Sequence, residues 1–200
     1  ADRLANMRLV SEQLESEREV VINERKERVD NDPGGKLSEV LWATAFTAHP
    51  YGQPTIGWMP DIEGLSLADC KAFHRTWYAP NNAVVVVVGA VEAEPLLTEL
   101  VAHYGALEPA EIPKTPAVVE PRQTEPRRKV LALPLSGERL MLGLHAPAAG
   151  DPMHPALEVL NEALFEGDSA RLRRALVTDG ELASGFYAFV PAFAEPGLYE

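Results

Sequence analysis

Apolar residues recur at three- and four-residue steps through the first part of the chain, at Leu4, Met7, Val10, Leu14 and Val21. This spacing is typical of one face of an α-helix, so it predicts one long helix over residues 2–30. The Pro-Gly-Gly sequence at 33–35 predicts the end of that helix. Similar spacing predicts a second helix over residues 37–47, followed by a turn-rich loop.

Later segments predict both helices and strands. A helix is expected over residues 67–77, where Ser66 is placed to cap it and Asp69 to complete a capping box. Further helices are expected over residues 94–104, 155–165 and 169–178, the last capped by Ser169. The valine-rich run 83–89 predicts a strand that is covered on both faces. Residues 129–135 and 139–145 predict a hairpin, and residues 183–190 a further strand.

Five prolines set apart the segment between residues 108 and 128: Pro109, Pro113, Pro116, Pro121 and Pro126. Prolines at this density exclude a helix or a central strand, because each lacks a backbone N–H. The segment therefore predicts an exposed linker that lets the parts on either side move. The expected division is a first part over residues 1–108, a linker over 109–127 and a second part over 128–200.

Two carboxylates stand out on the first predicted helix. At 100° per residue, Glu17 and Glu24 fall within the apolar arc that runs from Val20 round to Met7. Seven residues make nearly two turns, so the two side chains point the same way, about 10 Å apart along the axis. Burial of an unpaired carboxylate is costly, so such a pair meets arginines from elsewhere, reaches solvent at the edge of the stripe, or binds a metal. Periodicity alone leaves these alternatives open.

Composition excludes several classes of function. A net charge of −12 opposes binding to nucleic acid or to an anionic membrane surface, and no apolar run is long enough to span a bilayer. The single cysteine, Cys70, cannot form an internal disulfide. With 46% hydrophobic and 24% charged residues, the chain is expected to be globular, in one large or two modest domains.

Six motifs together resemble the pitrilysin/insulinase family of zinc peptidases, and most closely its bacterial members that are similar to the mitochondrial processing peptidase. These motifs are residues 17–24 (EREVVINE), 30–33 (DNDP), 49–52 (HPYG), 56–58 (IGW), 78–82 (YAPNN) and the valine run. The sequence 167–172 (GDSARL), with the Leu-Ala pair that follows it at 182–183, resembles the start of the family's second, homologous domain. The resemblance implies an α+β fold of two partial, homologous domains, with helices packed on mostly antiparallel sheets.

The resemblance also implies a metal site. Family members bind zinc with two histidines of an HxxEH motif and one distant glutamate, and the glutamate of the motif activates the zinc-bound water. By position, Glu24 corresponds to the distant zinc ligand and Glu17 to an acid that supports the site. The 200 residues contain no HxxEH motif, and their histidines are dispersed: His49, His74, His103, His145 and His154. Two ligands and the catalytic base are therefore missing from this chain.

Two functions remain open at this stage. The chain is either part of a zinc metalloendopeptidase that cleaves peptides or unfolded segments, or a non-catalytic scaffold subunit of the same fold. In both cases a peptide substrate, a homologous partner subunit or a homodimer is the expected partner, and this fragment alone is expected to bind no zinc. His49 is expected to be a structural hydrogen-bonding group, and Arg171 a solvated or salt-bridged side chain. Gly89 lacks the spaced glycines of a dinucleotide site.

Overall fold

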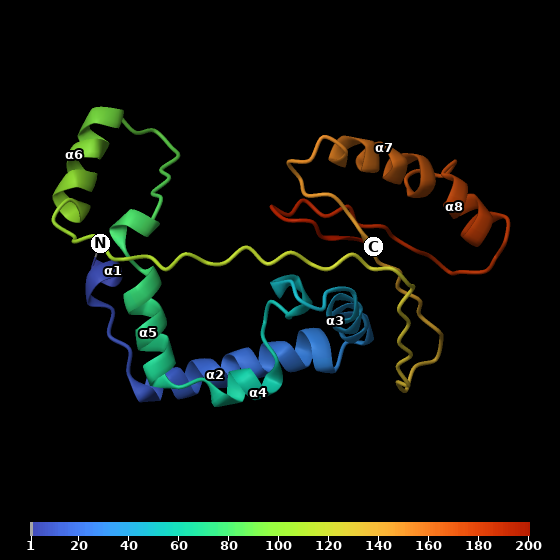
Figure 1. Cartoon of the computed structure of the whole chain (residues 1–200), viewed down its shortest axis with the longest axis horizontal. Coiled ribbons are helices and arrows are strands. Elements are labelled where there is room, and N and C mark those ends of the chain that lie inside the picture. Colours follow the sequence, from blue (N-terminus) through green and yellow to red (C-terminus); the bar gives the residue numbers. More distant parts are fainter. Residues whose placement is uncertain (1) are drawn as a thin grey trace. The chain divides into compact units, whose positions relative to one another are not determined.

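A computed structural model describes residues 2–200, and its residues group into two compact units. One unit joins the residues up to Arg25 with Ile56–Ala117, and the other joins Lys26–Thr55 with Val118–Glu200. Each unit therefore combines segments that are far apart in sequence. Figure 1 shows the elements along the chain.

Helices make up the first unit. They are α1 (Asp2–Asn6), α2 (Ser11–Arg25), α4 (Met59–Gly64), α5 (Leu67–Trp77) and α6 (Ala93–Tyr104). The helix predicted over residues 2–30 is therefore interrupted: residues 7–10 separate α1 from α2, and a π-helical turn, Lys26–Asp30, follows α2. The capping box of α5 is confirmed, because the Ser66 side chain accepts from the Asp69 N–H while the Asp69 carboxylate accepts from the Ser66 N–H.

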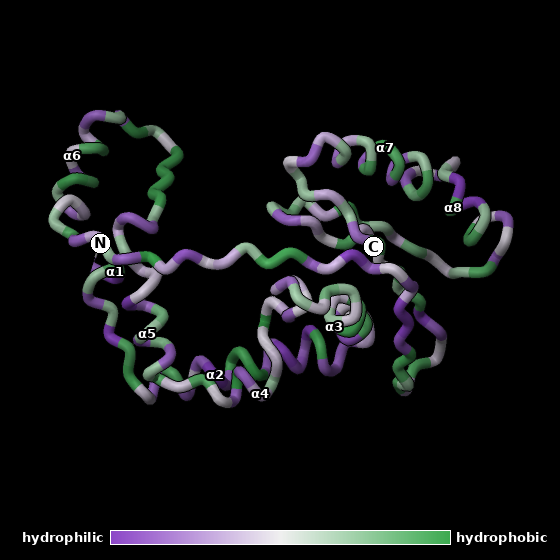
Figure 2. The backbone as a smooth tube through the Cα atoms, in the orientation of Figure 1, coloured by the Kyte–Doolittle hydropathy of each residue, from purple (hydrophilic) through white to green (hydrophobic). Residues whose placement is uncertain are grey.

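The predicted valine strand does not form. Residues 83–88 are extended, and Val84, Val85, Val86, Val87 and Val88 expose between 43% and 92% of their surface. Figure 2 shows this run in the green of hydrophobic residues. A strand needs a neighbour whose backbone groups pair with its own, and within residues 2–200 no segment pairs with this one. The composition of the run is that of a covered strand, but within residues 2–200 the five valines remain exposed.

Helix α3 (Pro33–Ala45) is the central element of the second unit. The sequence Pro-Gly-Gly begins this helix, contrary to the prediction that it would end the preceding one. The Asp32 carboxylate accepts a hydrogen bond of 2.6 Å from the Gly35 N–H, and Pro33 occupies the first helical position, where a missing N–H costs nothing. These two capping signals outweigh the helix-breaking tendency of the three residues.

A small antiparallel sheet and two further helices complete the second unit. The sheet pairs β1 (Leu144–His145) with β2 (Leu198–Tyr199), while α7 (His154–Phe165) and α8 (Arg171–Arg173) precede β2 in sequence. The predicted α7 is confirmed, but the hairpin over 129–145 is reduced to β1, and 183–190 form no regular strand. In this hairpin region Val130, Leu140 and Leu142 are exposed, so no packing supports a ladder there. Antiparallel pairing is thus confirmed, over a much shorter length than expected.

The core of the second unit is aromatic. Leu198 is fully buried against Ala45 and Phe46, with Trp42 and Tyr51 packed around them. The Trp42 and Phe46 rings stack at 5.5 Å, and the Trp42 indole N–H donates to the Glu200 carboxylate over 2.7 Å. Helix α3 is thereby joined to the end of the chain.

The predicted linker has no helix or strand at any of residues 109–127, all of which the structure describes. Its second half is nevertheless fixed: Glu120 binds the loop after α3, and Arg127 donates to the carbonyls of Thr44 and Ala45, both at 2.8 Å. Residues 118–127 therefore hold the C-terminal end of α3 and do not behave as a free tether. No helix within residues 2–200 is both long and apolar enough to cross a membrane.

Candidate functional site

Helix α2 carries both predicted site residues, Glu17 and Glu24. Its packed face differs from the one that periodicity predicted. The side chains that are buried or half-buried along α2 include Leu14, Arg18, Val21, Ile22 and Arg25, at steps of three and four residues, and α2 packs against α4. The two arginines take part in this face although they are charged. The expected placement of Glu17 on the packed side is therefore wrong for this chain, because the face is centred on the arginines.

Arg18 and Arg25 hold α2 against α4, because each binds a backbone carbonyl beside one end of α4. The Arg25 side chain is 3% exposed, and its Nη1 donates to the Gly57 carbonyl over 2.8 Å, just before α4 begins. The Arg18 guanidinium donates to the Leu65 carbonyl, just after α4 ends. Two arginines seven residues apart span about 10 Å of helix, which matches the length of a six-residue helix. They determine how α2 is rotated about its own axis.

Each glutamate immediately precedes one of these arginines. Residues that follow one another on a helix differ by 100°, so the arginine contacts also determine where Glu17 and Glu24 lie. Glu17 is exposed, whereas Glu24 is half-buried and has an interaction of its own. The two carboxylates therefore share one side of α2 in unequal surroundings.

The described residues do not complete a zinc site. Structural and catalytic zinc sites need at least three protein ligands, and within residues 2–200 no group of three or more histidine, cysteine, aspartate or glutamate side chains is arranged to bind a metal. Glu24 is the one predicted ligand that the chain supplies. No chemical step through a metal can be derived from these residues alone.

All five histidines lie elsewhere and have other contacts. The His49 Nδ1 accepts from the Tyr51 N–H over 3.2 Å, which is the structural role expected for it. His154 is buried, with its Nε2 2.8 Å from the Pro191 carbonyl oxygen, and the His74 Nε2 lies 3.4 Å from the Arg3 carbonyl oxygen. His145 packs edge-on against Phe46, and His103 lies on α6 beside Glu99. These contacts give the five histidines structural roles.

Ser169 was predicted to cap a helix, and this prediction is wrong. Helix α8 begins at Arg171, after Ala170, and has no side-chain cap. Gly167, with a φ of 75°, forms the preceding turn in a conformation that glycine adopts readily. Ser169 itself is exposed, and Arg171 is exposed as expected.

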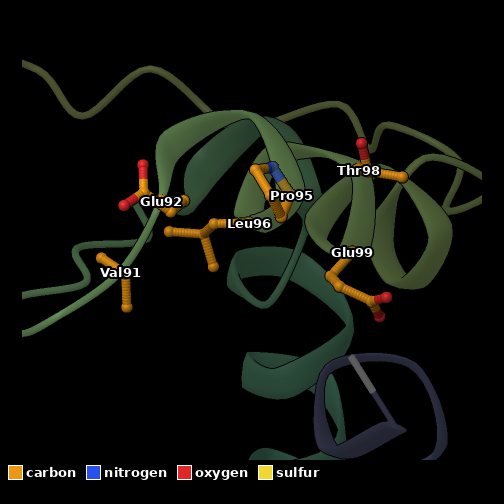
Figure 3. Close-up of a pocket in the computed structure, with 6 residues that line it drawn as sticks. All are labelled: Val91, Glu92, Pro95, Leu96, Thr98 and Glu99. Atoms are coloured by element: carbon orange, nitrogen blue, oxygen red, sulfur yellow. The ribbon is translucent and has the colours of Figure 1, made fainter.

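A recess on α6 contains none of the predicted site residues. It is a shallow, open depression of about 440 Å³ lined by Val91, Glu92, Pro95, Leu96, Thr98 and Glu99 (Figure 3). Two carboxylates and several apolar side chains line it, and the picture shows Glu92 and Glu99 on either side of Pro95 and Leu96. Helix α2 therefore remains the candidate site.

Sequence reasoning missed Glu120, whose carboxylate accepts four hydrogen bonds. Its two oxygens accept from the N–H groups of Thr47, Ala48 and His49 and from the Thr47 hydroxyl, at 2.8 to 2.9 Å. Partial desolvation raises the pKa of Glu120, but these four hydrogen bonds outweigh it and lower the pKa to about 2. No local pattern in the sequence could have identified it, since its partners are more than 70 residues away.

Comparisons with known proteins support the resemblance seen in the sequence. Residues 64–200 match the family described as "Peptidase M16 inactive domain". The chain is 36% identical over 188 residues to the zinc protease PqqE of Helicobacter pylori, covering 92% of this chain and 42% of that protein. It is 29% identical over 110 residues to a probable mitochondrial-processing peptidase subunit beta of Schizosaccharomyces pombe, covering 55% of this chain and 24% of that one.

A solved structure resembles this fold closely. The crystal structure of a protease from Helicobacter pylori superposes with a TM-score of 0.80 at 32% identity, covering 96% of this chain and 47% of that one. The chain thus spans less than half the length of these relatives. The likeness extends over almost all of its residues.

Proposed function

Because this chain belongs to the peptidase M16 family, we propose that it is part of a zinc-dependent metalloendopeptidase in which Glu24 is one metal ligand and Glu17 a supporting acid. The observation that carries the proposal is the pair of Glu-Arg sequences at 17–18 and 24–25 on α2. In each pair the arginine binds a carbonyl at one end of α4, so the neighbouring glutamate is held at a defined angle. A ligand must be presented in a fixed orientation to bind a metal well.

The metal, when bound in the parent protein, would supply an acidic centre that polarises a peptide carbonyl or a water molecule. The residues of this chain would contribute orientation and charge. Glu24 would present a carboxylate from a helix whose rotation is fixed by Arg25, and its partial burial would keep bulk water away from one side. Glu17, two turns earlier and exposed, would act on the site through hydrogen bonds.

The division into two homologous domains joined by residues 109–127 remains part of this proposal. In the parent, the first part would carry α2 and the second would help to enclose a peptide substrate between the domains. A homologous partner subunit or a homodimer is consistent with the name of the processing-peptidase relative, which is itself a subunit. For this 200-residue chain alone we expect no peptidase activity.

The second candidate is a non-catalytic scaffold subunit. The description of the matching family as an inactive domain favours it, because residues 64–200 make up most of the chain. Glu17 and Glu24 lie outside that match, and in a scaffold neither would need to be a carboxylate. Their presence, together with the ordered contacts beside them, ranks the peptidase first.

The experiment compares three variants of the full-length parent: Glu24→Gln, Glu17→Gln and, as a matched control, Glu19→Gln on the exposed side of α2. We expect Glu24→Gln to lose zinc and activity together, and Glu17→Gln to keep most of its zinc but turn over a peptide about 10- to 100-fold more slowly. Zinc per chain is measured alongside peptide cleavage. Full zinc and full activity in both variants would refute the assignment, and a parent without zinc or activity would support the scaffold.

A further inference from the structure

The valine run, residues 83–88 between α5 and α6, offers unpaired backbone and exposed side chains in one segment (Figure 1). Within residues 2–200 no other backbone group bonds to these six residues. Every second valine (Val84, Val86 and Val88) exposes between 77% and 92% of its surface, and the two between them expose 43% and 49%. This alternation has the period of two of an extended strand, so the run already has the form of a strand.

Contacts beside the run determine where it begins and ends. The Asn81 side chain exchanges two hydrogen bonds with the backbone of Ala110, of 2.9 and 3.0 Å, and the Asn82 side chain donates to the Trp77 carbonyl over 2.9 Å. After the run, the Val91 N–H donates to the carbonyl two residues earlier in a tight turn. The start of the run is therefore anchored, which lowers the conformational entropy that it loses when it pairs.

We propose that the valine run pairs, antiparallel, with the valine run of a second copy of this chain. Segments of six residues with high β-propensity, no charge and no proline are the ones that pair with themselves through their backbones. The sequence AVVVVV meets each of these conditions. Because both edges of the run are unpaired, a third copy can add to the first pair, and three-stranded sheets are more stable than isolated pairs.

Charge selects both the occupant and its direction. No charged residue lies between residues 81 and 91, so a charged partner would find no counter-charge along the run, whereas an identical run matches its length and neutrality. In a parallel pair, Glu92 would lie beside Glu92 of the second copy, and like charges directly opposite are destabilising. In an antiparallel pair centred on Val86, Glu92 lies beside Pro80 instead, and the like charges stay apart.

The small size of the run makes this pairing weak. Five valine side chains and their backbone offer far less than the roughly 800 Å² per partner that a stable interface buries, so we expect self-association on the order of 10 to 100 μM. Each copy carries a net charge of −12, and added salt screens the repulsion between copies. Salt should therefore strengthen the association, whereas it would weaken a contact made by opposite charges.

Sedimentation velocity of the 200-residue chain tests the proposal, and the expected result is a mass that rises above that of one copy at about 100 μM. Val86→Lys should weaken the association about tenfold or more, because two lysines would face each other at the centre of the pair. Val130→Lys is the matched control: Val130 is 76% exposed against 77% for Val86, lies outside the run and changes the net charge equally. A mass that stays at one copy, or equal losses in both variants, would overturn the proposal.

A mixture of two variants tests whether the runs meet directly. Val86→Glu alone should also associate about tenfold more weakly than the unaltered chain, for the same reason as Val86→Lys. An equal mixture of the two should recover most of this loss, because opposite charges then face each other across the pair. A mixture that associates as weakly as its components would overturn the proposal.

Cysteine cross-linking tests the direction of the pair. In a Cys70→Ser background, which removes the single native thiol, Val86→Cys should form a disulfide between copies under mild oxidation, whereas Val84→Cys should not. In the antiparallel pair Val84 faces Val88, and the two copies of residue 84 lie about 14 Å apart, too far for a disulfide. Equal cross-linking of both variants would indicate parallel strands, and cross-linking of neither would place the contact elsewhere; either result would overturn the proposal. None of these measurements needs zinc, so their failure would leave the role of Glu24 untouched.

Discussion

Replacing Glu120 by glutamine should loosen the loop after α3. The change keeps the size of the side chain but removes the negative charge that four donors now share. A pKa lowered from 4.5 to about 2 would correspond to about 3 kcal/mol if it were fully expressed as stability. Because the carboxylate is partly solvated, water screens part of this, and we expect a loss of about 1–2 kcal/mol.

Hydrogen exchange measures this loss locally. At neutral pH, the amides of Thr47, Ala48 and His49 should exchange about 5- to 30-fold faster in Glu120→Gln than in the unaltered chain. Glu125→Gln changes an exposed carboxylate of the same segment and should leave these amides unaffected. Unchanged exchange in Glu120→Gln would refute this reasoning. It would show that the hydrogen bonds of 2.8 to 2.9 Å from the loop to Glu120 do not stabilise that loop.

The effect of Glu120 should depend on pH in a defined direction. Its pKa is lower in the folded protein than in the unfolded chain, so its stabilisation is present above about pH 4.5 and is lost as the pH falls toward 2. The difference in exchange between the unaltered chain and Glu120→Gln should therefore be full at pH 6.5 and smaller at pH 3. A difference that grew on acidification would contradict the assignment.

Three further changes test separate features. Gly35→Ala should lower the free energy of unfolding by about 2 kcal/mol or more, because the added methyl group would collide with a backbone carbonyl. Gly137 has open space around it, so Gly137→Ala should leave the free energy of unfolding almost unchanged in the same urea titration. Arg25→Met should cost about 1–3 kcal/mol by leaving a carbonyl without its donor, and Lys26→Met, at an exposed position, is its control. Val86→Lys should slow aggregation, followed by light scattering, without lowering the unfolding midpoint, since this valine is 77% exposed; faster aggregation would contradict that.

Features that depend on neighbours in sequence could be predicted, and those that depend on distant partners could not. The capping box of Ser66 and Asp69 spans four residues, so its signal is complete within the sequence. The start of α3 is also encoded locally, by Asp32 and Pro33, although the two glycines after them are typical of a helix end. The valine run has the composition of a strand, yet a strand also requires a partner, which composition cannot reveal.

The candidate site shows the same division. Periodicity found the helix that bears Glu17 and Glu24, because apolar steps of three and four residues are a property of that segment alone. It misjudged which side of the helix packs, since Arg25 counts as polar in any hydropathy pattern although its stem is buried and its head group binds a carbonyl. The sequence does contain a signal for the packed side: Arg25 follows Val21 by four residues and Ile22 by three, so all three share one face of the helix.

The interleaved composition of the two units has a consequence for synthesis on the ribosome. Helix α3 is made early, but Trp42 meets Glu200, its hydrogen-bonding partner, only after 158 further residues have been added. Until then the aromatic side of α3 lacks its cover, and the emerging chain carries unprotected apolar surface that invites association with other chains. Closing so long a loop also slows folding, because its entropy must be lost before the contacts form. A nascent chain stalled before Leu198 would therefore be the species that most needs a chaperone.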